Sequence, residues 1–217
     1  MTTIGGPSLR VRRVLTSLSI LLCMVSVTLV ASCARRGEVK PDSPPYAKLI
    51  GKWTREGSVY RGIESRLVVH ATYRGLEFRE AYVREYGDRY RLDDYRREKL
   101  LATERAGYER AEEFFLAVST LDEKWNDLHR SDSVWRLYLK NDSGERVEPI
   151  AIRRVDEESP LFREFYPKLD RWSRGYIVTF PKYSEAGEAP LINDDTLRIT
   201  LVITGALGQT EIEWRMK

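Results

Sequence analysis

The segment Thr196–Met216, TLRITLVITGALGQTEIEWRM, decides the fold class. Apolar side chains alternate with polar ones along both of its halves, at Leu197, Ile199, Leu201, Ile203, Ile212, Trp214 and Met216. A period of two is typical of strands that bury one face. Gly205 and Gly208 lie between the halves and favour a turn. The segment therefore predicts two antiparallel strands that close the domain.

Working outward from this hairpin, five more segments have the pattern of short strands: Ser65–Arg74, Glu113–Thr120, Ser133–Asn141, Arg146–Val155 and Tyr176–Phe180. The tetrapeptide Asn141-Asp142-Ser143-Gly144 predicts a tight turn, because Asn, Asp and Gly tolerate the required dihedral angles. We therefore expect Arg146–Val155 to return as the hairpin partner of Ser133–Asn141. Seven short strands with turns between them predict an antiparallel β-sandwich.

The segment from Gly75 to Arg110 breaks the strand pattern. It is rich in Glu, Arg, Leu and Ala, and apolar residues recur in it at helical spacing. Asp93 or Asp94 can cap a second helix, since a carboxylate accepts hydrogen bonds from free N–H groups of the first turn. The fold we expect is mainly β: an immunoglobulin-like sandwich with a two-helix insertion at about 75–110. The alternative is an α+β fold with the helices packed on one antiparallel sheet.

The first 33 residues have the order of an export signal. Arg10, Arg12 and Arg13 precede an apolar stretch from Val14 to Val30, and Ala31-Ser32-Cys33 follows it. The tetrapeptide Val30-Ala31-Ser32-Cys33 resembles the lipobox of bacterial lipoproteins. That resemblance implies cleavage between Ser32 and Cys33, and lipidation of Cys33 with a diacylglyceryl group and a fatty acyl chain such as palmitate. The alternative is an uncleaved membrane anchor, because the apolar stretch approaches the length of a spanning helix.

These features divide the chain into three parts. Residues 1–32 are the expected signal peptide, 33–45 are a lipidated cysteine and a polar linker with three prolines, and 46–217 form a single domain. The domain would be tethered to the cell membrane or the outer membrane and face the periplasm or the exterior. In some of the bacterial lipoproteins that this leader resembles, the residue after the lipidated cysteine influences sorting, and an alanine such as Ala34 would favour the outer membrane.

Charge and cysteine content exclude several function classes. The 36 Lys and Arg residues include the three arginines of the leader, so the rest of the chain balances its 33 acidic residues. A neutral domain lacks the positive surplus of a nucleic-acid binder, and we expect no nucleic-acid partner. Cys23 and Cys33 are the two cysteines of the chain, which leaves 34–217 without disulfides or thiolate chemistry. The common nucleotide and redox motifs are absent, so no cofactor is expected.

Few residues stand out as catalytic or metal-binding candidates. His70 lies in a strand pattern and fits a structural role. The parts of a hydrolytic triad occur in one connector, at Asp127, His129, Asp132 and Ser133, but closeness in sequence is not triad geometry. Asn193-Asp194-Asp195 lacks the spacing of a calcium loop and fits a turn. We therefore assign no catalytic residue and no metal site.

The most unusual composition is the Tyr- and Arg-rich stretch from Tyr73 to Arg97. Aromatic residues combined with arginine are typical of partner-binding surfaces. Our candidate binding residues are Tyr82, Tyr86, Tyr90, Trp125 and His129. The function we expect is a lipid-anchored cell-envelope protein of binding or structural type, with an envelope protein or glycan as partner. The alternative is an envelope hydrolase that uses carboxylates or His129.

Overall fold

A computed structural model describes residues 44–184 and 189–217. The expected signal peptide, the Ser32–Cys33 cleavage point and the lipidated Cys33 lie outside these residues. Pro44 and Pro45, which we expected at the end of the linker, begin helix α2 (Pro44–Trp53). Proline is well tolerated in a first helical turn, because the N–H that it lacks has no helical partner there.

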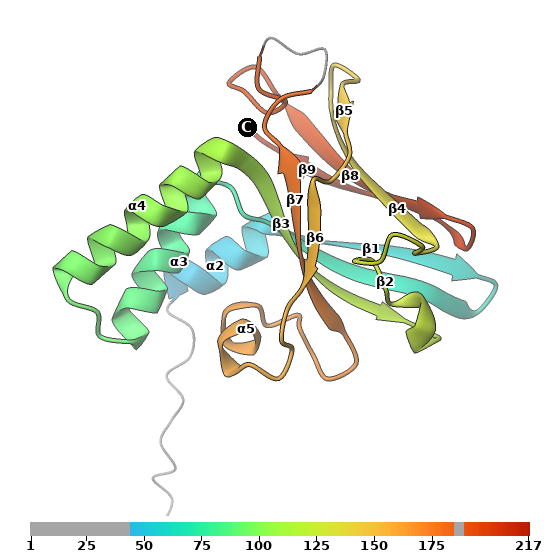
Figure 1. The fold of residues 1–217 in the computed structure, drawn as a ribbon, viewed down its shortest axis with the longest axis horizontal. Helices are drawn as coiled ribbons and strands as arrows, with labels where there is room; N and C mark the ends of the chain where they lie inside the picture. Colours follow the sequence, from blue (N-terminus) through green and yellow to red (C-terminus); the bar gives the residue numbers. More distant parts are fainter. Residues whose placement is uncertain (1–43, 185–188) are drawn as a thin grey trace, which may run out of the picture. The chain divides into compact units, whose positions relative to one another are not determined.

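Nine strands of the described chain form two antiparallel sheets (Figure 1). The five-stranded sheet contains, in spatial order, β1 (Thr54–Arg61), β2 (Glu64–Tyr73), β3 (Ala111–Thr120), β7 (Arg174–Pro181) and β6 (Ala151–Arg154). The four-stranded sheet contains β5 (Arg146–Val147), β4 (Trp135–Asn141), β8 (Arg198–Gly205) and β9 (Gly208–Arg215). The mainly β prediction is confirmed, whereas an immunoglobulin-like topology is not.

The predicted helical pair is confirmed as α3 (Leu76–Arg89) and α4 (Asp94–Arg110), between β2 and β3. Asp93 caps α4, since its carboxylate accepts a hydrogen bond from the Arg96 N–H at 2.8 Å. Together with α2, these helices lie at one end of the five-stranded sheet, opposite the turn of the β1–β2 hairpin (Figure 1). A short helix, α5 (Pro160–Phe165), and a 3-10 turn, η1 (Glu123–Trp125), complete the elements. No helix in the described residues is both long and apolar enough to cross a membrane.

Aromatic side chains join the two sheets and the short helix into one core. On the inner face of the five-stranded sheet, the Phe114 ring lies 5.2 Å from that of Trp214 on β9. The indole N–H of Trp214 donates to the carbonyl oxygen of Trp53 at 2.7 Å, which ties the end of α2 to β9. On the outer face, Phe115 stacks on Tyr166, just after α5, at 3.8 Å. Strand β3 is therefore covered on both faces, as its continuous apolar sequence requires.

Two details of the strand prediction are wrong. Arg146–Val155 is not one strand: β5 pairs with β4, and β6 pairs with β7 in the other sheet. Pro149 lies between them and has no N–H to continue a ladder, so the chain changes sheets there. Leu197 is 57% exposed because β8 begins one residue later.

Strand β1 was not predicted, because few of its side chains are buried and its sequence has no alternating apolar pattern. Val59 and Gly57 are its buried positions, and the other side chains are partly or fully exposed. A Cβ atom on Gly57 would lie 2.7 Å from Cγ1 of Ile212, so glycine allows β1 to pass closely over β9. This contact between β1 and β9 is tertiary, so it produces no periodic pattern of apolar residues in the sequence of β1.

Four charged side chains fasten the helical pair to the sheet. Arg79 on α3 donates to Glu104 on α4 at 2.6 Å and to Glu113 on β3 at 2.8 Å. Arg74, at the end of β2, pairs with the same two carboxylates at 3.2 and 2.9 Å. The side chains of Arg79 and Arg74 are only 5% and 10% exposed. Each charge therefore depends on its partners in place of water.

We expect Arg79→Met to lower the free energy of unfolding by about 3 kcal/mol, because it leaves two half-buried carboxylates with one arginine. Urea denaturation of the full-length chain in detergent measures this. Arg105→Met is the matched control: Arg105 also joins α4 to α3, through Glu80, but its side chain is 56% exposed. Loss of that exposed ion pair should lower the free energy of unfolding by about 1 kcal/mol or less. Equal losses in the two variants would contradict the structural role of the buried network.

Candidate functional site

Two open pockets meet at the end of β3 that is farthest from α3 and α4. Each has a volume of about 610 Å³, and they share Glu123, Arg154 and Arg174 as a common wall. We name them the Trp172 pocket and the Trp125 pocket after the tryptophan that lines each. Their sizes are in the range of ordinary small-ligand sites.

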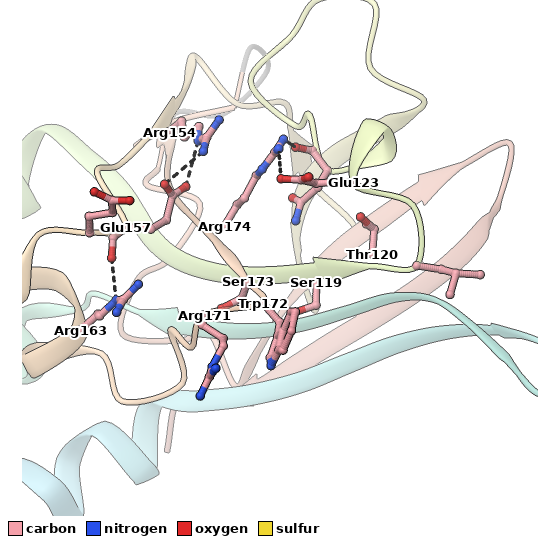
Figure 2. Close-up of a pocket in the computed structure, with 13 residues that line it drawn as sticks. Ser119, Thr120, Glu123, Arg154, Glu157, Arg163, Arg171, Trp172, Ser173 and Arg174 are labelled. Carbon is pink, nitrogen blue, oxygen red and sulfur yellow. Dashed lines mark hydrogen bonds and ion pairs between the residues drawn. The ribbon is translucent and has the colours of Figure 1, made fainter.

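Strand ends and loops supply the lining of the Trp172 pocket (Figure 2). Ser119 and Thr120 come from the end of β3, Arg154 from the end of β6, and Arg174 from the start of β7. Arg171 and Trp172 lie in the loop that joins α5 to β7. Because β3 and β7 pair antiparallel, with Val118 opposite Arg174, these distant segments reach the same end of the sheet.

Arg174 organises the wall between the pockets. Its guanidinium donates to the carbonyl oxygen of Asn126 at 2.7 Å and also pairs with Glu123. Asn126 is buried, and its amide donates to the carbonyl oxygen of Val118 at 2.6 Å. The hydroxyl of Tyr176 donates to the carbonyl oxygen of Asn126 at 2.7 Å. The η1 turn is thus held to β3 and β7 by hydrogen bonds rather than by apolar packing.

A second ion pair belongs to the same wall. Arg154 forms two hydrogen bonds with the carboxylate of Glu157, at 2.9 and 3.2 Å. Burial by itself would raise the pKa of Glu157, but hydrogen bonds from Arg154 and from backbone N–H groups outweigh it and lower the pKa. Glu157 is therefore ionised at neutral pH, and its carboxylate accepts hydrogen bonds but donates none.

Trp172 is the most exposed aromatic ring of the site, at 76%. Its backbone N–H donates to Asp170 at 2.8 Å, and the guanidinium of Arg171 lies 5.7 Å from its ring centre. Leu121, also in this pocket, is 64% exposed. Two exposed apolar side chains therefore line the same pocket, and they give it an apolar surface that a ligand can cover.

The structure separates our five candidate binding residues. Trp125 and His129 line the Trp125 pocket, where His129 also stacks on Tyr176 at 5.9 Å. Tyr82, Tyr86 and Tyr90 lie along α3 instead. Tyr82 and Tyr86 contact the Phe165 ring at 4.9 and 5.7 Å, and Tyr86 stacks on Tyr90 at 4.4 Å. Tyr82 and Tyr86 pack the helix against α5, whereas Tyr90 follows the helix and is 52% exposed. None of the three lines either pocket.

The parts of a triad do not assemble. The Ser133 hydroxyl donates to Asp127 at 2.8 Å and accepts from the Trp135 N–H at 3.2 Å. Asp132 pairs with Arg130 at 2.9 Å. Ser133 is buried, whereas His129 is exposed. The connector is therefore organised as a turn that starts β4.

Other candidate groups have structural roles as well. Burial lowers the pKa of His70, which lies on β2 with its Nδ1 3.7 Å from a Glu56 oxygen. Asn193 accepts from the Asp195 N–H at 2.9 Å, which is the turn expected before β8. Within residues 44–184 and 189–217, no three His, Cys, Asp or Glu side chains gather as a metal site.

Sequence reasoning missed Arg154, Arg171, Trp172 and Arg174. The signal that was available is the run Arg171-Trp172-Ser173-Arg174, an aromatic residue between arginines just before a predicted strand. The larger Tyr- and Arg-rich stretch has more aromatic residues, but Tyr82 and Tyr86 pack against Phe165, and the exposed Tyr90 and Tyr95 lie outside both pockets. Composition alone does not distinguish a buried aromatic residue from an exposed one.

No family model, curated protein or solved structure matches the chain. The functional argument therefore depends on the geometry of the two pockets and on the leader sequence.

We expect Ser133→Ala to lower the free energy of unfolding by about 1–2 kcal/mol, since it leaves Asp127 and the Trp135 N–H without their partner. His129→Ala removes an exposed ring and should change the stability by less than about 0.5 kcal/mol. Thermal unfolding of both variants tests the turn role of the connector. If His129→Ala lowered the free energy of unfolding as much as Ser133→Ala does, His129 and Ser133 would act as a coupled pair, which would contradict the turn role.

Proposed function

We propose that the protein is a lipid-anchored binding protein of the cell envelope, and that its two-pocket site holds an envelope glycan. The observation that carries the proposal is the exposed Trp172 ring beside ion-paired side chains. A sugar ring has an apolar face that stacks on an aromatic side chain and a rim of hydroxyl groups that need hydrogen-bond partners. The pocket offers both kinds of group.

The ion pairs supply the polar half of this recognition. Arg154 with Glu157, and Arg174 with Glu123, place donors and acceptors next to each other on one wall. Each guanidinium is planar and is held by its carboxylate, so its remaining N–H groups have a fixed direction. Fixed donors and acceptors suit vicinal hydroxyl groups. The paired charges also give the wall little net charge, so an uncharged sugar meets no large desolvation cost there.

The hydrolase alternative has less support. Glycoside hydrolysis by a carboxyl pair needs one group that stays protonated near neutral pH. In the Trp172 pocket, the pKa of Glu157 is lowered rather than raised. His129 is exposed, and the Ser133 hydroxyl is directed to Asp127. We therefore propose binding without catalysis.

The leader sequence supports the location that we propose. The lipobox-like Val30-Ala31-Ser32-Cys33 follows a basic and then an apolar segment, which together indicate export and lipid attachment. The polar residues that follow have the composition of a spacer, which would hold the site within reach of glycans near the membrane. A domain tethered in this way meets its ligand at high local concentration, so a modest affinity suffices.

The glycan proposal is tested with purified peptidoglycan sacculi and the full-length chain in detergent. We expect Trp172→Ala to weaken sedimentation with sacculi about tenfold, because one stacking contact contributes about 1.4 kcal/mol. Tyr95→Ala is the matched control, since Tyr95 on α4 is 74% exposed and lies outside both pockets. Equal binding by wild type and Trp172→Ala would contradict the proposal. So would crosslinking in native membranes that recovers a protein at this site and no glycan.

The anchor is tested by growing cells with an alkyne analogue of palmitate. We expect the wild-type chain to be labelled and to fractionate with membranes, and Cys33→Ala to lose the label, because the lipobox model needs that thiol. Cys23→Ala is the matched control: it removes the other cysteine, which the proposed cleavage discards, and should leave labelling unchanged. Labelling that survives Cys33→Ala would refute lipidation at this residue.

A further inference from the structure

The two pockets are neighbours, because Glu123, Arg154 and Arg174 line both of them. A ligand long enough to contact both sides of these three side chains would lie in both pockets. Trp172 lines one end and Trp125 lines the other. Two aromatic rings separated by a polar wall suit a chain of sugars better than a single ring.

The Trp172 pocket has arginines that its own carboxylates do not neutralise. Four arginines and three glutamates line it. Glu157 pairs with Arg154 and Glu123 with Arg174. The remaining charged residues of the lining are one carboxylate, Glu158, and two cations, Arg163 and Arg171. Arg163 donates through Nε to the carbonyl oxygen of Glu157 at 2.8 Å, and Arg171 lies over the Trp172 ring. Neither forms an ion pair with a carboxylate among the described residues.

Figure 2 shows where these side chains lie. The ion-paired Arg154, Glu157, Arg174 and Glu123 occupy one side of the view, and Arg163, Arg171 and Trp172 occupy the other. The cation of Arg171 is therefore next to the ring on which a sugar would stack. An acidic group on that sugar would be within reach of a guanidinium that has no other anion to bind.

The Trp125 pocket differs, because its cations are already paired. Lys124 pairs with Asp122 at 2.6 Å and Arg130 with Asp132 at 2.9 Å. The remaining arginines of this pocket belong to the shared wall and have Glu123 and Glu157 as partners. An anionic group gains little here, and an uncharged sugar is the better fit. The two ends of the site therefore differ: the Trp172 pocket favours an anionic sugar and the Trp125 pocket favours an uncharged one.

We infer that the ligand is an acidic glycan that extends through both pockets, with a carboxylate-bearing sugar at Trp172, Arg171 and Arg163 and an uncharged sugar at Trp125. This inference rests on the proposed glycan binding and adds the charge, the length and the orientation of the ligand. No covalent step is involved.

The test compares two families of soluble probes by titration calorimetry on the full-length chain in detergent. Hyaluronan oligomers alternate glucuronic acid with N-acetylglucosamine, and N-acetylglucosamine oligomers of the same length carry no charge. We expect the hyaluronan hexamer to bind about tenfold more tightly than the uncharged hexamer at low salt. Arg171→Gln should remove this preference, so that this variant binds the two hexamers with equal affinity. We also expect the preference to shrink as salt is raised.

Arg130→Gln is the matched control, because it removes an exposed arginine that already has a partner in the Trp125 pocket. This variant should keep the preference for the acidic hexamer. Trp125→Ala should weaken binding of the hexamer and leave binding of the hyaluronan disaccharide unchanged, since the disaccharide fits the Trp172 pocket alone. Thermal unfolding of each variant shows whether it is folded.

The outcomes distinguish failure of the acidic-glycan inference from failure of the proposed glycan binding. Equal affinity for charged and uncharged hexamers would overturn the inference and leave the proposed glycan binding intact. Equal loss of acidic preference in Arg130→Gln and Arg171→Gln would also overturn it, because the effect would then be one of overall charge. Failure of both probe families and of sacculi to bind would refute the proposed function together with the inference.

Discussion

The buried network of Arg74, Arg79, Glu104 and Glu113 is the constraint on which the rest of the domain depends. It joins the end of β2, both helices of the α3–α4 pair and the start of β3 at one point. Partly buried charges tolerate few geometries, because each must keep its partners to offset the loss of water. The network therefore fixes the position of α3 more sharply than apolar packing would.

The position of α3 affects the functional site through α5. Tyr82 and Tyr86 on α3 pack on Phe165, and Tyr166 follows with its ring stacked on Phe115 of β3. These contacts hold the start of the loop that carries Arg171 and Trp172. At the other end of that loop, Arg174 is bound by Asn126 and Glu123. An exposed tryptophan can thus be presented in a defined place, because both ends of its loop are anchored in the core.

The division of the arginines shows how similar residues acquire different roles. Arg74 and Arg79 hold helices to the sheet, Arg154 and Arg174 build the wall between two pockets, and Arg171 faces solvent beside Trp172. These side chains have the same chemistry, and their roles differ because different carboxylates lie within reach of each guanidinium. The near-zero net charge of the chain after the leader hides this arrangement, because paired and unpaired cations contribute equally to a sum.

Sequence pattern was sufficient for the strongly patterned elements: β2, β3, β4, β7, the β8–β9 hairpin, and the two helices with the Asp93 cap. Their periodicity and capping are local, so neighbouring residues suffice to predict them. The remaining features depend on tertiary contacts. β1 has almost no apolar pattern and exists because Gly57 fits against Ile212; Pro149 sends β5 and β6 to different sheets. Of the candidate site, Trp125 and His129 were identifiable in advance, whereas Arg154, Arg171, Trp172 and Arg174 were not. These residues become a site because antiparallel pairing brings the ends of β3, β6 and β7 together, and long-range pairing has no signature in local sequence.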